Sequence, residues 1–398
     1  MQNLKLKLKD WYTIAAVGLL NGILLLVLLN LVLYAVMRAR RPGPQMQDLT
    51  LDADSLRKAY PGWREEDIKT LLRETRMEER YEYEPFTEFR ERPLRGKFVN
   101  IDPAGFRVSK DQAPWPPRAD AINVFVFGGS TTFGVGLPDD QTITSYLQQF
   151  ADADHSSPPL AIYNFAQPAY FSTQERIQFQ RLLGDGYVPQ VAVFIDGLND
   201  FLFADGQPLF ASRLRNFMAG KSEATGLSNI PMVQAAHWVG QRWSSPKVQS
   251  PMKRKDEAAL LEGVVDRWLA NKRIIELLAQ GYGVRPLFVW QPVPTYNYDL
   301  QYHLFLQSHK DIQVRGSMWQ YALRCRAGYP LMQEMRAQGK LGSNVLWLAD
   351  LQQDKRQNLY VDHIHYNAEF SQEIAAEIYR FLRDGPKAAP ASAHQSGP

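Results

Sequence analysis

Three short polar turns carry the residues of this sequence whose types and spacing could do chemistry. Ser130 lies in a glycine-rich turn, Asn199 lies in an Asn-Asp turn, and Asp362 stands three residues before His365. A histidine that a carboxylate orients can take the proton of a serine hydroxyl, and the serine can then attack a carbonyl carbon. An asparagine amide can donate to the oxyanion that forms. The three turns therefore indicate acyl chemistry through a serine nucleophile, provided that the fold brings them together.

Each turn also allows a simpler interpretation. Ser130 could cap a following helix, and Asn199 could serve ordinary turn geometry. Asp362, His363 and His365 could form half of a metal site, but no second cluster of matching ligands stands out elsewhere in the sequence. The sequence therefore predicts neither a metal nor a cofactor.

The turn around Ser130 does not match the known glycine-rich motifs. A phosphate loop needs a lysine after its second glycine, where this chain has Val135. A dinucleotide turn needs a third glycine, where this chain has Asp139. The Gly-x-Ser-x-Gly elbow of α/β-hydrolases ends in a glycine, where this chain has Thr132. What remains is a serine in a turn between a strand and a helix, where the neighbouring glycines allow a tight backbone.

The elements that must position these turns follow from an alternation of apolar runs and helical patterns between residues 120 and 383. The runs are short and almost wholly apolar, as in strands that are buried on both faces. Strands that alternate with helices form a parallel sheet with helices on both sides and a site at the carboxyl ends of the strands. The sequence predicts a flavodoxin-like, three-layer α/β/α fold with a five-stranded parallel sheet. The predicted strands are Ile122–Phe127, Leu160–Phe165, Val191–Ile195, Pro286–Trp290 and Val345–Leu348, and the clearest predicted helices are Thr173–Leu183, Asp256–Gln280, Ser317–Gln338 and Glu369–Leu382.

One transmembrane helix is predicted ahead of this domain. Residues 13–36 contain no charge, and 19 of these 24 residues are apolar. At about 1.5 Å per residue such a helix is long enough to cross a bilayer. A cleavable signal peptide is the alternative, but its apolar region is normally shorter and is followed by small residues, whereas here Met37–Arg41 is strongly basic. Asn21 and Asn30 could bind a partner helix in the membrane.

Composition assigns the remaining segments and excludes some functions. Residues 1–12 form a short basic N-terminus, residues 37–119 a juxtamembrane linker and charged helical region, and residues 384–398 a disordered tail. The charge run Trp63–Arg92 predicts a solvated helix. An insertion at about 201–255 carries aromatic residues that we expect to form a satellite cluster rather than a lid. The net charge of +3 argues against nucleic acid as a partner.

The three turns, in order, resemble the sequence blocks of the SGNH hydrolases, the GDSL-type esterase and lipase family. The blocks correspond to Gly128-Gly129-Ser130, Gly197-Leu198-Asn199-Asp200 and Asp362-His363-Ile364-His365. Residues 120–383 would then be an SGNH hydrolase-like domain. The resemblance covers about two thirds of the chain, and Gly129 stands where the family usually has an aspartate.

The resemblance implies a role for each site residue. Ser130 would be the nucleophile, His365 its general base and Asp362 the group that orients the imidazole. The oxyanion hole would consist of the Ser130 N–H, the Asn199 amide and the Ala169 N–H. Ala169 stands where the family has a glycine. Alanine does not adopt glycine's positive φ angles cheaply, so this donor could be shifted.

The function that the resemblance implies is that of a membrane-anchored serine esterase with an acyl-serine intermediate. The expected partner is an ester-bearing glycan or lipid, and O-acetyl groups of a cell-surface or exported glycan are the favoured substrate. The domain is expected on the extracytoplasmic, periplasmic side. Two alternatives remain: an O-acyltransferase that uses the same triad, and a non-catalytic glycan- or partner-binding module with a degenerate site.

Overall fold

The structure is a computed structural model that describes residues 2–40, 53–76, 81–155, 158–219, 230–233, 254–306 and 320–385. The chain divides into two compact units. One unit comprises Met1–Asp48 and Ser212–Met252, and the other comprises Leu49–Ala211 and Lys253–Pro398. The three polar turns all belong to the second unit.

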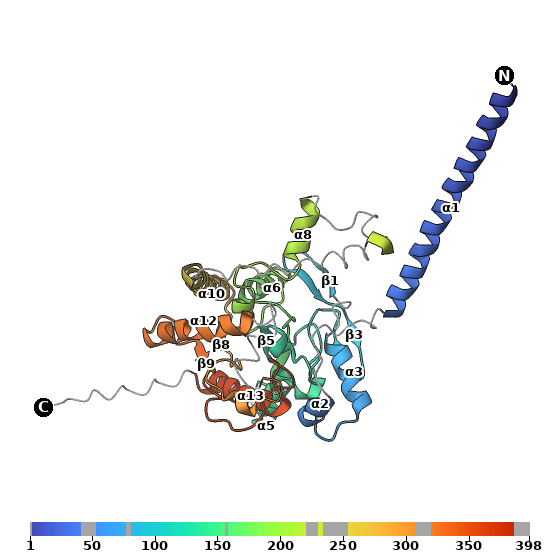
Figure 1. Ribbon diagram of the computed structural model, residues 1–398. Helices are drawn as coiled ribbons and strands as arrows, with labels where there is room; N and C mark the ends of the chain where they lie inside the picture. Colours follow the sequence, from blue (N-terminus) through green and yellow to red (C-terminus); the bar gives the residue numbers. More distant parts are fainter. Residues whose placement is uncertain are drawn as a thin grey trace. The chain divides into compact units, whose positions relative to one another are not determined.

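A five-stranded parallel sheet forms the centre of the second unit (Figure 1). Its strand order is β6-β5-β7-β8-β9, and every neighbouring pair is parallel. The strands form where apolar runs interrupt the helical patterns, because a central parallel strand is buried on both faces. The predicted three-layer fold with five parallel strands is confirmed, and the strand ends agree with the sequence within one residue. The strands are β5 (Ile122–Gly128), β6 (Leu160–Asn164), β7 (Val191–Asp196), β8 (Arg285–Trp290) and β9 (Val345–Trp347).

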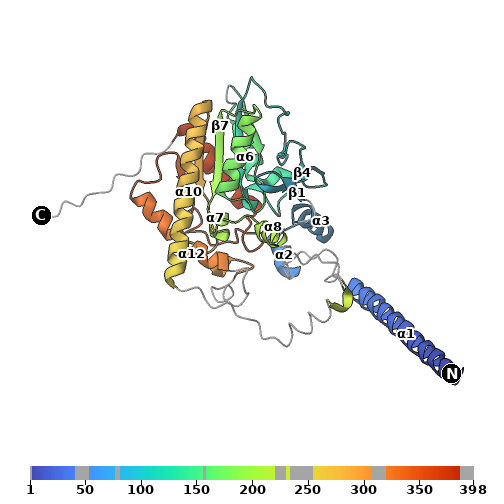
Figure 2. The same cartoon turned by 90° about the horizontal axis from the view of Figure 1, so that it is seen from above.

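Helices cover both faces of the sheet. On one face lie α5 (Ile143–Ala153) and α13 (Ala368–Asp384), which pack against each other (Figure 1). The other face carries α6 (Ser172–Gly184), α10 (Arg254–Tyr282) and α12 (Gln320–Ala337), and α10 runs beside α6 (Figure 2). The polar turns follow the carboxyl ends of the strands.

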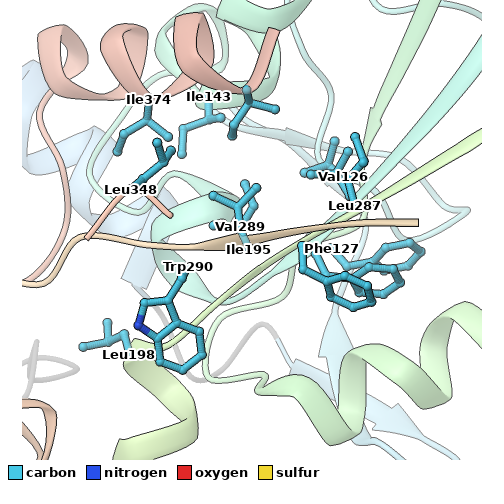
Figure 3. Close-up of a cluster of buried hydrophobic side chains, with 14 of the residues drawn as sticks. Val126, Phe127, Ile143, Ile195, Leu198, Leu287, Val289, Trp290, Leu348 and Ile374 are labelled. Carbon is cyan, nitrogen blue, oxygen red and sulfur yellow. The ribbon is translucent and has the colours of Figure 1, made fainter. Parts of the chain in front are cut away.

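Alternate side chains of the strands fill the space on each face. Figure 3 shows Val126 on the side of Ile143 and Ile374, while Phe127 and Trp290 point to the opposite side. All five side chains are less than 2 % exposed. The sheet is therefore a rigid base for the turns that leave its edge.

The residues between the N-terminal helix and the sheet pack into the same unit as the sheet. They form α2 (Ala53–Ala59), α3 (Glu65–Arg76) and two short hairpins. Their apolar side chains bury a cluster that we call the second core, which also includes Phe133 and Val361 beside the polar turns. The second core consists of Tyr60, Ile68, Leu71, Leu72, Val99, Ile101, Phe133, Val135, Leu137, Ala166 and Val361.

The prediction of one solvated helix over Trp63–Arg92 is wrong in two respects. The helix ends at Arg76, and a hairpin of β1 (Tyr81–Glu84) and β2 (Glu88–Glu91) follows. The buried side chain of Phe89 gives this hairpin an apolar face, which the many charges concealed in the sequence. In addition, α3 is not exposed to solvent on every side, because part of it lies in the second core.

A smaller hairpin leads from these residues to the sheet. It consists of β3 (Leu94–Arg95) and β4 (Asn100–Ile101), which pair antiparallel. The boundary predicted at residue 120 remains a prediction.

The insertion at about 201–255 is described only in part. It includes the last two residues of α7 (Leu198–Leu202) and the whole of α8 (Ala211–Met218). Phe210 packs edge-on against Phe89, with 5.2 Å between ring centroids. The tryptophans of the insertion, Trp238 and Trp243, lie outside the described residues.

The N-terminal helix α1 (Gln2–Arg40) contains a span, Asp10–Val36, of 27 residues with a mean hydropathy of 2.5. This span is long and apolar enough to cross a membrane, although a signal sequence near an N-terminus meets the same criterion. Asn30 hydrogen-bonds within the chain: its Nδ2 donates to the Leu26 carbonyl at 2.8 Å, and its Oδ1 accepts from the Met232 N–H at 3.1 Å. The partner helix predicted through Asn21 and Asn30 stays a prediction.

Candidate active site

The turn after β5 presents Ser130 at the start of a very short helix. Gly129 precedes α4 (Ser130–Phe133), and Gly134 ends it in the left-handed region at φ 86°. The other three residues of α4 are buried, whereas Ser130 is partly exposed. As the first helical residue, Ser130 has a backbone N–H without a partner inside the helix. This turn therefore exposes one hydroxyl and one amide of the same residue.

Arg107, fully buried, holds the far end of this turn. Its guanidinium donates to the carbonyls of Phe133 and Gly134, both at 2.7 Å, and of Leu137 at 2.6 Å. It also pairs with Asp139 at 3.1 Å. Burial raises the pKa of Asp139, and Arg107 opposes this rise. A charged group fully bonded in this way fixes the backbone that follows Ser130.

The loop after β9 joins Asp362 and His365. Asp362 Oδ2 lies 2.7 Å from His365 Nδ1, and Asp362 Oδ1 accepts the backbone N–H groups of Ile364 and His365, each at 2.8 Å. A carboxylate held by two amides accepts the Nδ1 proton, which leaves Nε2 as the basic nitrogen of the neutral ring. His365 Nε2 is buried and has no hydrogen-bond partner among the described residues.

The candidate oxyanion donors lie on two further turns. Ala169 has φ 64°. This alanine therefore adopts the left-handed conformation that a glycine at this position would adopt easily. Asn199, in α7, donates from Nδ2 to the Tyr170 carbonyl at 2.6 Å. The second proton of this amide remains for another acceptor.

Close approaches between glycines and neighbouring side chains show that the turns converge. A Cβ built on Gly129 would lie 2.2 Å from Asn199 Nδ2 and 3.2 Å from the Tyr170 carbonyl oxygen. A Cβ on Gly136 would lie 2.7 Å from Val361 Cγ2. The serine turn thus touches the Asn199 turn on one side and the histidine loop on the other.

No hydrogen bond joins Ser130 Oγ to His365 Nε2 in the part of the chain that the structure describes. Catalytic hydrogen bonds are often long before substrate binds and tighten in the complex, so this geometry does not remove either group from consideration.

Two hydrogen bonds connect the end of β8 to the same turns. Thr131 Oγ1, next to the serine, donates to Gln291 Oε1 at 2.7 Å. Tyr366 OH, next to the histidine, donates to the Pro292 carbonyl at 2.7 Å. The residues at the end of β8 therefore hold both the serine turn and the histidine loop in place.

Three carboxyl groups are buried behind Asn199. They belong to Glu175, Asp196 and Asp200, and burial raises the pKa of all three, that of Asp196 to about 8. Trp268 Nε1 donates to Asp196 Oδ2 at 2.9 Å, and Ser172 Oγ donates to Asp200 Oδ1 at 2.6 Å. These groups hold their protons more strongly than exposed carboxyl groups do. They therefore place little negative charge beside Asn199.

His363, the other histidine of the loop, is nearly buried, and its ring lies 5.9 Å from that of Phe305. Within the described ranges no three His, Cys, Asp or Glu side chains are grouped so that they could hold a metal ion.

Sequence analysis did not single out Arg107 or Gln291. Gln291 directly follows a predicted strand, at the edge where site residues are expected, so its position was a usable signal. Arg107 carries no spacing signal, because only the tertiary fold brings it to the serine turn.

Comparisons with known proteins give similarities of fold. No family model matches the chain, and no curated protein matches its sequence. Several similar solved structures are esterases or members of the GDSL lipolytic family. One is a member of the lipolytic protein G-D-S-L family from Veillonella parvula DSM 2008, with 11 % identity over 66 % of this chain and 100 % of that chain and a TM-score of 0.35.

Two further structures are similar to the same extent. An acetyl xylan esterase has 12 % identity over 66 % of this chain and 100 % of its own, with a TM-score of 0.35. The psychrotrophic esterase EstA from Pseudoalteromonas sp. has 13 % identity over 66 % of this chain and 97 % of its own, with a TM-score of 0.33. At these identities and TM-scores the likeness does not carry a function over to this chain.

Proposed function

We propose that the chain is a membrane-anchored serine esterase that forms an acyl-serine intermediate. The observation that carries this proposal is the Asp362–His365 pair, at 2.7 Å between Oδ2 and Nδ1, with Nε2 buried and unpartnered in the described part of the chain. A histidine fixed in this tautomer is suited to accept the proton of a serine that comes within reach of Nε2.

The proposed reaction moves one proton through His365. Nε2 takes the proton of Ser130 Oγ as the oxygen attacks the ester carbonyl carbon, and Asp362 stabilises the imidazolium that forms. The imidazolium then gives this proton to the leaving alkoxide, and the acyl group stays on Ser130. Water, activated by the same nitrogen, hydrolyses the acyl-serine.

The oxyanion of the tetrahedral intermediate would accept hydrogen bonds from three donors. These are the Ser130 N–H, the Ala169 N–H and the free proton of the Asn199 amide. The positive φ of Ala169 supports a competent hole, since this conformation is the one that a glycine would provide. It argues against the non-catalytic alternative, for which the alanine was the only motivation.

The substrate class follows from the anchor. A transmembrane α1 would hold the domain near a membrane surface, which favours O-acetyl groups of a cell-surface or exported glycan on the extracytoplasmic side. The same machinery acts as an O-acyltransferase if a sugar hydroxyl, instead of water, resolves the acyl-serine.

The test uses the full-length protein in detergent with a fluorophosphonate probe and p-nitrophenyl acetate. We expect labelling and turnover in the wild type and neither in Ser130→Ala, because the loss of a triad member lowers kcat by about 10⁴-fold or more. His365→Ala should lose as much, and the matched variant His363→Ala far less. Labelling or turnover retained in Ser130→Ala would refute the assignment. Release of acetate from an acetylated glycan, against transfer to an added sugar, separates hydrolysis from acyl transfer.

A further inference from the structure

A third histidine lies against the loop that carries the Asp362–His365 pair. His303 follows the short helix η3 (Leu300–Tyr302) and is 1 % exposed. Its ring stacks on that of Tyr360, with 4.8 Å between centroids and 14° between planes. Tyr360 stands two residues before Asp362, so His303 packs directly on the start of the loop.

The backbone fixes the tautomer of His303. Its Nδ1 accepts the N–H groups of Phe305 and Leu306, both at 3.1 Å. A ring nitrogen that accepts hydrogen bonds carries no proton, so the single proton of the neutral ring is on Nε2. Burial lowers the pKa of His303 to about 3, with the nearby His363 acting in the same direction and Asp362 in the opposite direction. The ring is therefore neutral wherever the esterase would work.

The Nε2–H of His303 is a buried donor without a partner among the described residues. It faces the backbone of His363, outside good hydrogen-bond geometry. An unsatisfied buried donor is destabilising, so a small movement that brings a loop acceptor to it is favourable. Among the described residues, the titratable groups that face this ring are Asp362, His363, Tyr298 and Tyr360.

We propose that His303 is a positioning residue for the Asp362–His365 pair: its Nε2–H donates to the backbone at His363 when the loop tightens around substrate, and this bond holds Asp362 against His365. The inference rests on the proposed esterase function. It adds a group that touches neither substrate nor Ser130 and acts only through the loop.

Two substitutions separate this role from simple packing. In His303→Asn the amide oxygen can replace Nδ1 as acceptor for the Phe305 and Leu306 N–H groups, but no donor reaches the position of Nε2. In His303→Gln the longer amide places an N–H donor near that position. A packing role predicts that both variants lose rate and stability together and keep the pH profile of the wild type, whereas a positioning role predicts a rate loss and a shifted profile in His303→Asn that His303→Gln reverses.

The experiment measures kcat and KM for p-nitrophenyl acetate, the pH profile of kcat/KM and the melting temperature of the full-length protein. We expect His303→Asn to lower kcat about tenfold, as for one lost hydrogen bond, with KM within about twofold. A loosened Asp362 stabilises the imidazolium less, so the lower limb of the pH profile should move to lower pH. His303→Gln should restore both the rate and the profile.

Three outcomes overturn the inference. A His303→Asn variant with the kcat and pH profile of the wild type would show that the Nε2–H does nothing for catalysis. Equal losses in both variants, together with equal drops in melting temperature, would show a packing role. Fluorophosphonate labelling of the wild type tests the proposed function separately. If the wild type is labelled and His303→Asn is unaffected, only the inference about His303 is refuted. If the wild type is not labelled, both the proposed function and the inference about His303 are refuted.

Discussion

Gly129 offers a direct test of whether Asn199 acts at the serine. Its φ of −89° is open to any residue, so a methyl group there strains no backbone. The methyl carbon would, however, lie 2.2 Å from Asn199 Nδ2, closer than any real contact, and 3.2 Å from the Tyr170 carbonyl oxygen. The carbonyl belongs to the backbone and the amide to a side chain, so Gly129→Ala should displace the Asn199 amide.

The magnitude follows from that displacement. To reach an ordinary contact the amide must move by more than about 1 Å, since non-bonded heavy atoms separate by about 3.5 Å. Such a movement breaks its bond of 2.6 Å to Tyr170 and takes its second proton away from the oxyanion. Loss of one oxyanion donor lowers kcat by about 100-fold, or about 3 kcal/mol, with little effect on KM. The lost bond to Tyr170 should lower the free energy of unfolding by about 1 kcal/mol.

The assay compares Gly129→Ala, Asn199→Ala and the double variant by steady-state hydrolysis of p-nitrophenyl acetate. Truncation of Asn199 removes the clash, so the double variant should be no slower than Asn199→Ala alone. Gly184→Ala is the matched control, because a Cβ at Gly184 has no heavy atom within 4 Å. A Gly129→Ala variant with the wild-type kcat would refute the reasoning, and so would losses that multiply in the double variant.

Three other substitutions have expected outcomes. Ala169→Gly removes a left-handed alanine, which costs about 1–2 kcal/mol, but frees the unfolded chain, so the unfolding free energy should change by less than about 1 kcal/mol. Its kcat should stay within about threefold because the N–H donor remains, and a 100-fold rise would show that the alanine distorts the hole. Arg107→Met leaves Asp139 buried without its cation and should lower the unfolding free energy by about 3–5 kcal/mol in urea titrations, which an unchanged midpoint would contradict. The pKa of Asp196 is raised to about 8, so the folded state keeps a proton that the unfolded state loses above about pH 4. Stability should therefore fall as pH rises toward 8, by up to about 1.4 kcal/mol per pH unit, and Asp196→Asn should reduce this slope in urea titrations at pH 5, 6.5 and 8, whereas an equal slope would contradict the assignment.

Much of the fold could be predicted from the sequence because parallel strands leave a strong local signal. A run such as Ile122–Phe127 is buried on both faces, so its sequence is continuously apolar. The positions of the strands, and of the turns that come after them, could therefore both be predicted. The hairpin Tyr81–Glu91 gave no such signal. Its charges pair across the strands, as Arg90 does with Glu82 at 2.7 Å, and in sequence they resemble the ion pairs of a helix.

The site was predictable in its residue types but not in its geometry. The order of Ser130, Asn199 and His365 along the chain was visible, because each follows a strand. The φ of Ala169 and the approach of Gly129 to Asn199 depend on residues far away in sequence. His303 was invisible for the same reason, since no spacing links it to the loop 60 residues later.

The second core has a consequence for the order in which the protein becomes active during synthesis. It joins Leu71 and Leu72, made early, to Val361, which leaves the ribosome almost 300 residues later. Contacts of such long range form late in folding. A nascent chain that already contains Ser130 still lacks the partner that closes this cluster beside the histidine loop. Hydrolytic competence would then appear only when synthesis is nearly complete, and a chain shortened to begin at residue 120 would expose Phe133 and Val361 to water.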